Sequence, residues 1–239
     1  MTLTYVPPYF DILPMYFVIL ALLPAMMVLS RLHPALAIAA SVLLWAVASF
    51  GWLELPRDPL IAEAWFFNPF CWQLVLFAGF AIERGWLPTP RAHPALIVAA
   101  VLLLACCVPL SWRPGLDANP LLQDIRNSLG ASIGKSHEGP LRFAHFLALA
   151  YLANLAAGPQ GLRLHGRFAE LTRSVGRQSL ACFMTGIALS FLSGVALMEV
   201  GRDNMLVVAA VNLTGIAVIV LTARVVAWFK SHPWRRAME

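Results

Sequence analysis

Charged residues are scarce in this chain. Asp, Glu, Lys and Arg make up 12% of its 239 residues, whereas about a quarter of a typical soluble domain is charged. Hydrophobic residues make up 60%, which is more than a single core of this size could hide from water. The composition therefore argues against an ordinary soluble domain. It predicts an integral membrane protein, for which lipid is the solvent.

Several functional motifs are also missing. The chain has no G-x-S-x-G, no H-E-x-x-H and no glycine-rich phosphate loop. Its six histidines lack the paired spacing of a metal or haem site. The cysteines lie in apolar stretches without C-x-x-C spacing, which predicts packing thiols rather than disulfides or metal ligands. We therefore expect no metal and no bound cofactor. The four cysteines are Cys71, Cys106, Cys107 and Cys182.

What the chain does have is seven apolar runs long enough to cross a bilayer. Trp and Tyr lie near several of their ends, as is typical of side chains at the headgroup level. The pattern predicts an all-α, polytopic bundle of about seven transmembrane helices, forming a single domain over 1–239. The runs cover 10–30, 34–53, 65–83, 94–111, 140–157, 174–198 and 204–228.

Loop cations predict the orientation. Nine of them follow the odd-numbered runs, and five lie on the opposite side. Cytoplasmic loops carry the excess of Lys and Arg, so we expect a cytoplasmic C-terminus and an external N-terminus. The first cation is Arg31, so no positive region of a secretory signal precedes the first run.

The long external loop, 112–139, contains its own periodic segment. Leu121, Leu122, Ile125 and Leu129 recur at helical spacing among polar residues. This predicts a short amphipathic helix on the outer membrane surface. It could form a lid over an external site or be a plain connector.

Polar residues inside or beside the apolar runs are candidates for substrate binding, because lipid tolerates them poorly. Some have simpler explanations: Asp11 and Arg177 could lie at headgroup depth, and Asn68 could start a helix. His145 could be a hydrogen-bonded interior histidine. The stretch from Lys135 to His145 is different, because it gathers Lys135, His137, Arg142 and His145 at one membrane face and could bind an anionic group. The candidate set is Asp11, Asn68, Trp72, Gln73, Lys135, Arg142, His145 and Arg177.

Four polar stretches resemble the OpgC family, which belongs to the acyltransferase type three group. They are FDILPMYFVILALLP, WFFNPFCWQLVLFAGF, GKSHEGPLRFAHFLALAYL and VGRQSLACFMTGIALSFL. The resemblance implies an inner-membrane enzyme of Gram-negative bacteria that transfers succinyl groups from cytoplasmic succinyl-CoA to osmoregulated periplasmic glucans. It also implies that the candidate residues, all of which lie in matching motifs, serve substrate binding.

One feature of that group has no counterpart here. The group's catalytic histidine lies in its first membrane helix, near a segment resembling R-D-x-x-R-G, and no such motif occurs in this chain. Family members usually have ten spans. We therefore expect the chain to correspond to the C-terminal part of the enzyme and to be inactive alone, with the missing helices as a possible partner. A transporter or flippase-like protein and a non-catalytic remnant are the alternatives.

Overall fold

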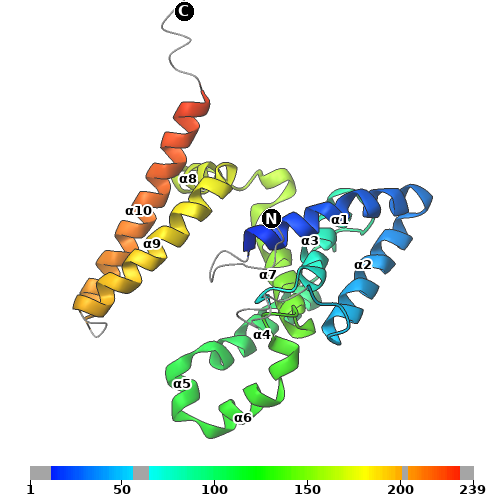
Figure 1. Ribbon diagram of the computed structural model, residues 1–239, viewed down its shortest axis with the longest axis horizontal. Coiled ribbons are helices and arrows are strands. Elements are labelled where there is room, and N and C mark those ends of the chain that lie inside the picture. The colour runs from blue at the N-terminus through cyan, green and yellow to red at the C-terminus, as the bar shows by residue number, and fades with distance from the viewer. Residues whose placement is uncertain (1–11, 56–64, 201–203, 232–239) are drawn as a thin grey trace, which may run out of the picture. The chain divides into compact units, whose positions relative to one another are not determined.

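The computed structural model describes residues 12–55, 65–200 and 204–231, and every regular element in these ranges is a helix (Figure 1). This confirms the predicted all-α class. The helices are α1 (Ile12–Leu32), α2 (Pro34–Ser49), α3 (Pro69–Glu83), α4 (Pro94–Ser111), α5 (Arg113–Ala118), α6 (Pro120–Ser128), η1 (Gly130–Ile133), α7 (Pro140–Ala157), η2 (Pro159–Gly161), α8 (Arg167–Arg177), α9 (Ser179–Val200) and α10 (Met205–Lys230).

Each predicted apolar run coincides with a helix, namely α1, α2, α3, α4, α7, α9 and α10. Within the described ranges, four helices are long and apolar enough to cross a membrane: α1, α4, α9 and α10. α2 and α3 are apolar but shorter, with 16 and 15 residues. The chain is thus a helical membrane protein, and seven remains an approximate number of spans.

Four helices begin with the same local arrangement. A His or Asn side chain accepts a hydrogen bond from the backbone N–H two residues later, and proline occupies the first helical position. Proline suits that position because its φ is already helical and its missing N–H would have no helical partner there. The segment H-P-A-L even recurs at 33–36 and 93–96. The capping residues are His33, Asn68, His93 and Asn119.

Three predicted boundaries differ from the structure by four residues or more. The second run was expected to end at residue 53, but α2 ends at Ser49. The third run was expected from residue 65, but α3 starts at Pro69 because Asn68 caps it. The sixth was expected from residue 174, but the backbone at Gln178 (φ −112°, ψ 31°) ends α8 and α9 starts at Ser179. Residues 174–177 therefore belong to the separate amphipathic helix α8.

The contacts divide the chain into two units, residues 1–156 and 157–239. In the first, α1, α2 and α3 pack against one another. Small residues of α2, Ala37, Ser41 and Ala48, are buried and allow its backbone to approach its neighbours closely. The larger buried side chains come from α1 and α3: Met15, Ile19, Met26, Leu74 and Phe77.

In the second unit, α9 and α10 lie side by side and α8 contacts both (Figure 1). Cys182 of α9 and Ala223 of α10 are buried at the helix contact. At one end, the Lys230 ammonium donates a hydrogen bond of 2.7 Å to the side-chain oxygen of Gln178. This bond ties the end of α10 to the junction between α8 and α9. That both units form one transmembrane domain stays a prediction.

Candidate functional site

The start of α3 is the point at which three distant segments of the first unit meet. Asn68 joins them and is 5% exposed. Its side-chain oxygen accepts from the Phe70 N–H (3.0 Å) and its amide donates to the Leu53 carbonyl (2.9 Å). Its backbone N–H donates to the Ser136 carbonyl (2.9 Å). One asparagine thus holds the helix start, the chain after α2 and the loop before α7 together.

Two indoles fasten that loop, residues 134–139, to the helices. Trp72 of α3 donates to the Lys135 carbonyl (2.9 Å), and Trp45 of α2 donates to the Glu138 carbonyl (3.0 Å). The loop also closes on itself tightly. A β-carbon on Gly139 would lie 2.3 Å from the Ser132 carbonyl oxygen, so only glycine fits there. The loop is therefore held rigidly against α2 and α3.

Beneath the loop, α2 and α3 share a buried polar contact. Gln73 has no exposed surface, and its amide group bonds with Ser41 of α2. In an apolar helix pair such a contact fixes the helices in one register, because any shift would leave both groups unpaired.

Glu138 is the most unusual residue of the loop. It is 1% exposed, and its backbone has a φ of +42°, which non-glycine residues rarely adopt. Its Oε2 atom has no hydrogen-bond partner among the described residues. Burial raises the pKa of the Glu138 carboxyl to about 6, although the nearby Arg142 cation partly offsets this. This carboxyl can therefore bind and release a proton within the physiological pH range.

Arg142 projects from the first turn of α7 and is held in place by the loop. Its Nε and Nη2 atoms both donate to the Ile133 carbonyl, at 3.3 and 3.0 Å. A guanidinium fixed in this way is oriented before any ligand arrives, which suits the recognition of a carboxylate or an oxyanion.

A pocket of about 210 Å³ opens beside the start of α3. On one side the His137 Nε2 lies 3.9 Å from the Glu54 Oε1. Trp65 also lines the pocket, but its indole nitrogen is buried away from the open space and has no hydrogen-bond partner among the described residues. The pocket lining consists of Glu54, Leu55, Trp65, Phe66, Asn68, Pro69, Ser136 and His137.

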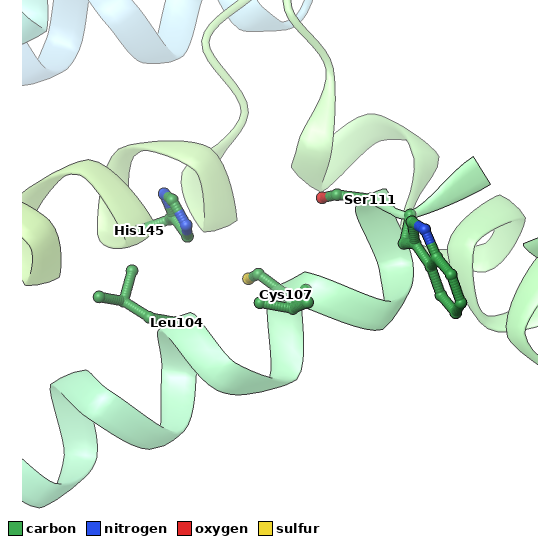
Figure 2. A pocket seen from close by; sticks show the side chains of 6 residues that line it. Leu104, Cys107, Ser111 and His145 are labelled. Carbon is green, nitrogen blue, oxygen red and sulfur yellow. The ribbon is translucent and has the colours of Figure 1, made fainter. Parts of the chain in front are cut away.

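His145 lies elsewhere, in a pocket of about 340 Å³ between α4 and α7. Figure 2 shows His145 across from Leu104 and Cys107, with Ser111 farther along the same helix. The sequence predicted Arg142 and His145 at one membrane face, but Arg142 does not line this pocket. The walls are polar and apolar in equal measure, and the lining is completed by Val108 and Trp112.

Five of the eight predicted substrate-binding residues gather around the start of α3 and the loop. Arg177 lies in the second unit, exposed at the end of α8. Asp11 lies outside the described residues. A role for any of the eight in binding substrate stays a prediction. The five that gather are Asn68, Trp72, Gln73, Lys135 and Arg142.

Sequence reasoning missed several residues of the site. Ser41 is a single hydroxyl in an apolar run, which only weakly indicates a polar contact between helices. Glu138 follows His137 in the G-K-S-H-E-G-P motif, so the sequence placed it near the candidate cations but did not show that it is buried. Glu54 was not singled out at all, and Trp65 was interpreted as one of the aromatic anchors at the ends of the apolar runs. Within 12–55, 65–200 and 204–231, no group of three His, Cys, Asp or Glu side chains could hold a metal ion.

The chain matches a known protein family. A family model described as "OpgC protein" matches residues 1–231, nearly the whole chain. Comparisons with curated proteins and with solved structures gave no match.

Proposed function

The chain belongs to the OpgC family, and we propose that it takes part in O-acyl transfer at the bacterial inner membrane. In this proposal, succinyl groups pass from succinyl-CoA to hydroxyl groups of periplasmic glucans. The family match over residues 1–231 is the observation that carries the proposal. The polar cluster at the start of α3 supports it, because an acyl transfer needs fixed donors and cations around the reacting carbonyl.

Arg142 is the group best suited to a charged partner. Its guanidinium is oriented by the Ile133 carbonyl, and the exposed Lys135 follows Ile133 by two residues along the chain. In the proposed reaction, these cations neutralise the succinyl carboxylate or the negative charge that develops on the carbonyl oxygen. The hydroxyl oxygen bonds to the acyl carbon, the C–S bond breaks, and CoA leaves as the thiol after taking up the hydroxyl proton.

The proposed topology gives each substrate its own membrane face. The start of α3 and the loop 112–139 lie on the side with fewer cations, which we assign to the periplasm, where the glucans are. The cations of α8 and of the end of α10 lie on the cytoplasmic side, where they would meet the phosphates of CoA. These cations are Arg167, Arg173, Arg177 and Lys230.

The test is genetic and chemical. The gene is deleted in the organism that carries it, so that any partner chain remains present, and succinyl esters on the extracted periplasmic glucans are measured by mass spectrometry. We expect the deletion to abolish the esters and this chain to restore them. Unchanged succinylation in the deletion strain would refute the proposal.

Variants then test the role of the guanidinium. Arg142→Ala should lower ester formation at least tenfold, and Arg142→Lys should recover part of it, because lysine keeps the charge but not the planar donors. Arg113→Ala is the matched control, because Arg113 is an exposed cation of the same external loop region. Equal losses of ester formation in the Arg142→Ala and Arg113→Ala variants would show that the reaction depends only on the net charge of this region.

A further inference from the structure

α8 is an amphipathic helix whose apolar residues lie on one side. Phe168, Leu171 and Val175 are three and four residues apart, so their side chains follow one face of the helix. Leu171 and Val175 are half-buried, as expected from the packing of α8 on α9 and α10, whereas Phe168 is 83% exposed. Leu162 and Leu164, which precede the helix, are 63% and 49% exposed. The apolar face therefore extends beyond the part that α9 and α10 cover.

The position of α8 follows from the two helices beside it. Only Gln178 separates α8 from α9, and the Lys230 ammonium at the end of α10 donates to the Gln178 side chain (Figure 1). α9 and α10 are both long and apolar enough to cross a membrane. α8 therefore lies at the end of this pair, where the spans leave the bilayer and the lipid headgroups begin.

The rest of the helix is positively charged. α8 carries three arginines, Arg167, Arg173 and Arg177, and a single acid, Glu170. Within the described part of the chain, none of the three guanidiniums forms a hydrogen bond or an ion pair with another residue. Arg167 directly precedes Phe168 and borders the apolar face. The other two arginines lie about 140° and 180° around the helix from Phe168, on its opposite side. An anionic group near the Phe168 ring would therefore meet Arg167 first.

We propose that α8 lies in the plane of the membrane and binds anionic phospholipid. The Phe168 ring inserts at the boundary between acyl chains and headgroups, and Arg167 donates to a headgroup phosphate. At the other end of the helix, Lys230 keeps two N–H donors for a second headgroup, because it uses only one on Gln178. A guanidinium also matches the spacing of two phosphate oxygens. A bilayer surface offers an apolar layer and phosphates side by side, and both strengthen the binding of such a helix.

This inference goes beyond the proposed function and does not depend on it. Arg173 and Arg177 lie on the side of α8 that faces away from the lipid, so they remain available to the phosphates of CoA. A soluble phosphate compound would also satisfy Arg167, but it would leave Phe168 and Leu164 exposed to water, which is unfavourable for apolar side chains. The exposed apolar residues are thus the reason for choosing lipid as the partner.

The first experiment measures the depth of Phe168 in a bilayer. The full chain, with its fourteen phenylalanines replaced by 4-fluorophenylalanine, is placed in nanodiscs of phosphatidylcholine and phosphatidylglycerol. The ¹⁹F signal of Phe168 is identified by its absence in Phe168→Leu, which keeps an apolar side chain. This signal should be broadened strongly by a lipid with a nitroxide near the top of its acyl chain, and only weakly by a gadolinium chelate in the water.

The second experiment tests the role of headgroup charge. The Phe168 signal should shift and saturate as phosphatidylglycerol replaces phosphatidylcholine. In Arg167→Gln, half-saturation should need about threefold more phosphatidylglycerol or more, because one cation at the surface is lost. Arg91→Gln is the matched control, because Arg91 is an exposed cation on the same predicted side of the membrane but belongs to the first unit. Its half-saturation should equal that of the parent chain.

Three results would overturn the proposal. One is that the aqueous gadolinium chelate broadens the Phe168 signal of the parent chain as strongly as the lipid nitroxide does, a measurement that does not depend on whether the charge variants fold. Another is the same dependence on phosphatidylglycerol in folded Arg167→Gln and Arg91→Gln variants. The third is the same shift when inorganic phosphate or CoA is added to nanodiscs of phosphatidylcholine alone, which would make Arg167 a site for soluble phosphates.

Discussion

Ser41 and Gln73 close a ring of two hydrogen bonds between α2 and α3. The Ser41 hydroxyl donates to the Gln73 Oε1 at 2.7 Å, and the Gln73 Nε2 donates back to the Ser41 carbonyl at 2.8 Å. Both residues are buried, with 3% and 0% of their surface exposed. The Gln73 Nε2 also donates to the Phe70 carbonyl at 3.2 Å, but the Ser41 hydroxyl and the Gln73 Oε1 have only each other among the described side chains.

We therefore expect the pair to behave as one unit in a double-mutant cycle. Gln73→Leu should lower the free energy of unfolding by about 1–3 kcal/mol, because it strands the Ser41 hydroxyl. Ser41→Ala in the Gln73→Leu background should cost nothing further or restore part of the loss, since no unpaired group is left. Thermal unfolding in nanodiscs measures all four proteins. Fully additive losses would contradict a coupled pair.

Glu138 makes stability depend on pH. Its pKa is about 6 in the folded chain, above the ordinary value of 4.5, so ionising it opposes folding. The protonated carboxyl contributes fully to the free energy of unfolding below pH 4.5, and this contribution is lost as the pH rises through about 6. The titratable groups beside it are the Arg142 cation, which favours ionisation, and the Cys71 thiol, which is uncharged.

Glu138→Gln should remove this dependence. The variant should be more stable than the parent by about 2 kcal/mol at pH 7.5, which is the free energy equivalent of the raised pKa, and equal to it near pH 4.5. Unfolding measured at both pH values tests this. Glu83→Gln, at the exposed end of α3, serves as the control and should have the same stability as the parent at both pH values. A stability gain for Glu138→Gln that does not change with pH would be at odds with a titrating carboxyl.

Gly139 should be the least replaceable glycine near the site. Gly139→Ala places a methyl group 2.3 Å from the Ser132 oxygen and 2.7 Å from the Ala131 oxygen, so the loop must move. We expect a loss of about 2 kcal/mol or more, as for an overpacked interior position. Gly79→Ala in α3 meets nothing within 4 Å and should be neutral or stabilise the helix. Melting temperatures of the two variants give the comparison.

Asn68 and Asn119 provide a matched test of the junction at α3. Both cap a helix that continues with proline, but Asn119 is exposed and its side chain only accepts from the Leu121 N–H. Asn119→Ala should cost about 1 kcal/mol, the usual value of a cap. Asn68→Ala should cost more, because it also strands the Leu53 carbonyl. Similar losses in thermal unfolding would mean that the contact with Leu53 contributes little.

Much of the fold could be predicted because its causes are local. Long apolar runs and the His-Pro or Asn-Pro starts act within a few residues, so the predicted 94–111 and 140–157 coincide with α4 and α7. The break at Gln178 was missed because a single backbone departure does not interrupt hydropathy. The candidate site was harder to predict from the sequence, because the hydrogen bond from Trp45 to the Glu138 carbonyl joins residues 93 positions apart. No local pattern shows which distant side chain will bond to a given loop carbonyl.

The shortness of α2 and α3 has a consequence for the membrane around them. At about 1.5 Å per residue, their 16 and 15 residues extend only about 24 and 22 Å, whereas the hydrocarbon layer is about 30 Å thick. Helices this short compress the bilayer beside them or draw headgroups and water inward. If α2 and α3 cross the bilayer, as the sequence predicts, the two aqueous compartments approach each other closely beside these helices. An acyl group transferred from one side of the membrane to the other would have its shortest path there.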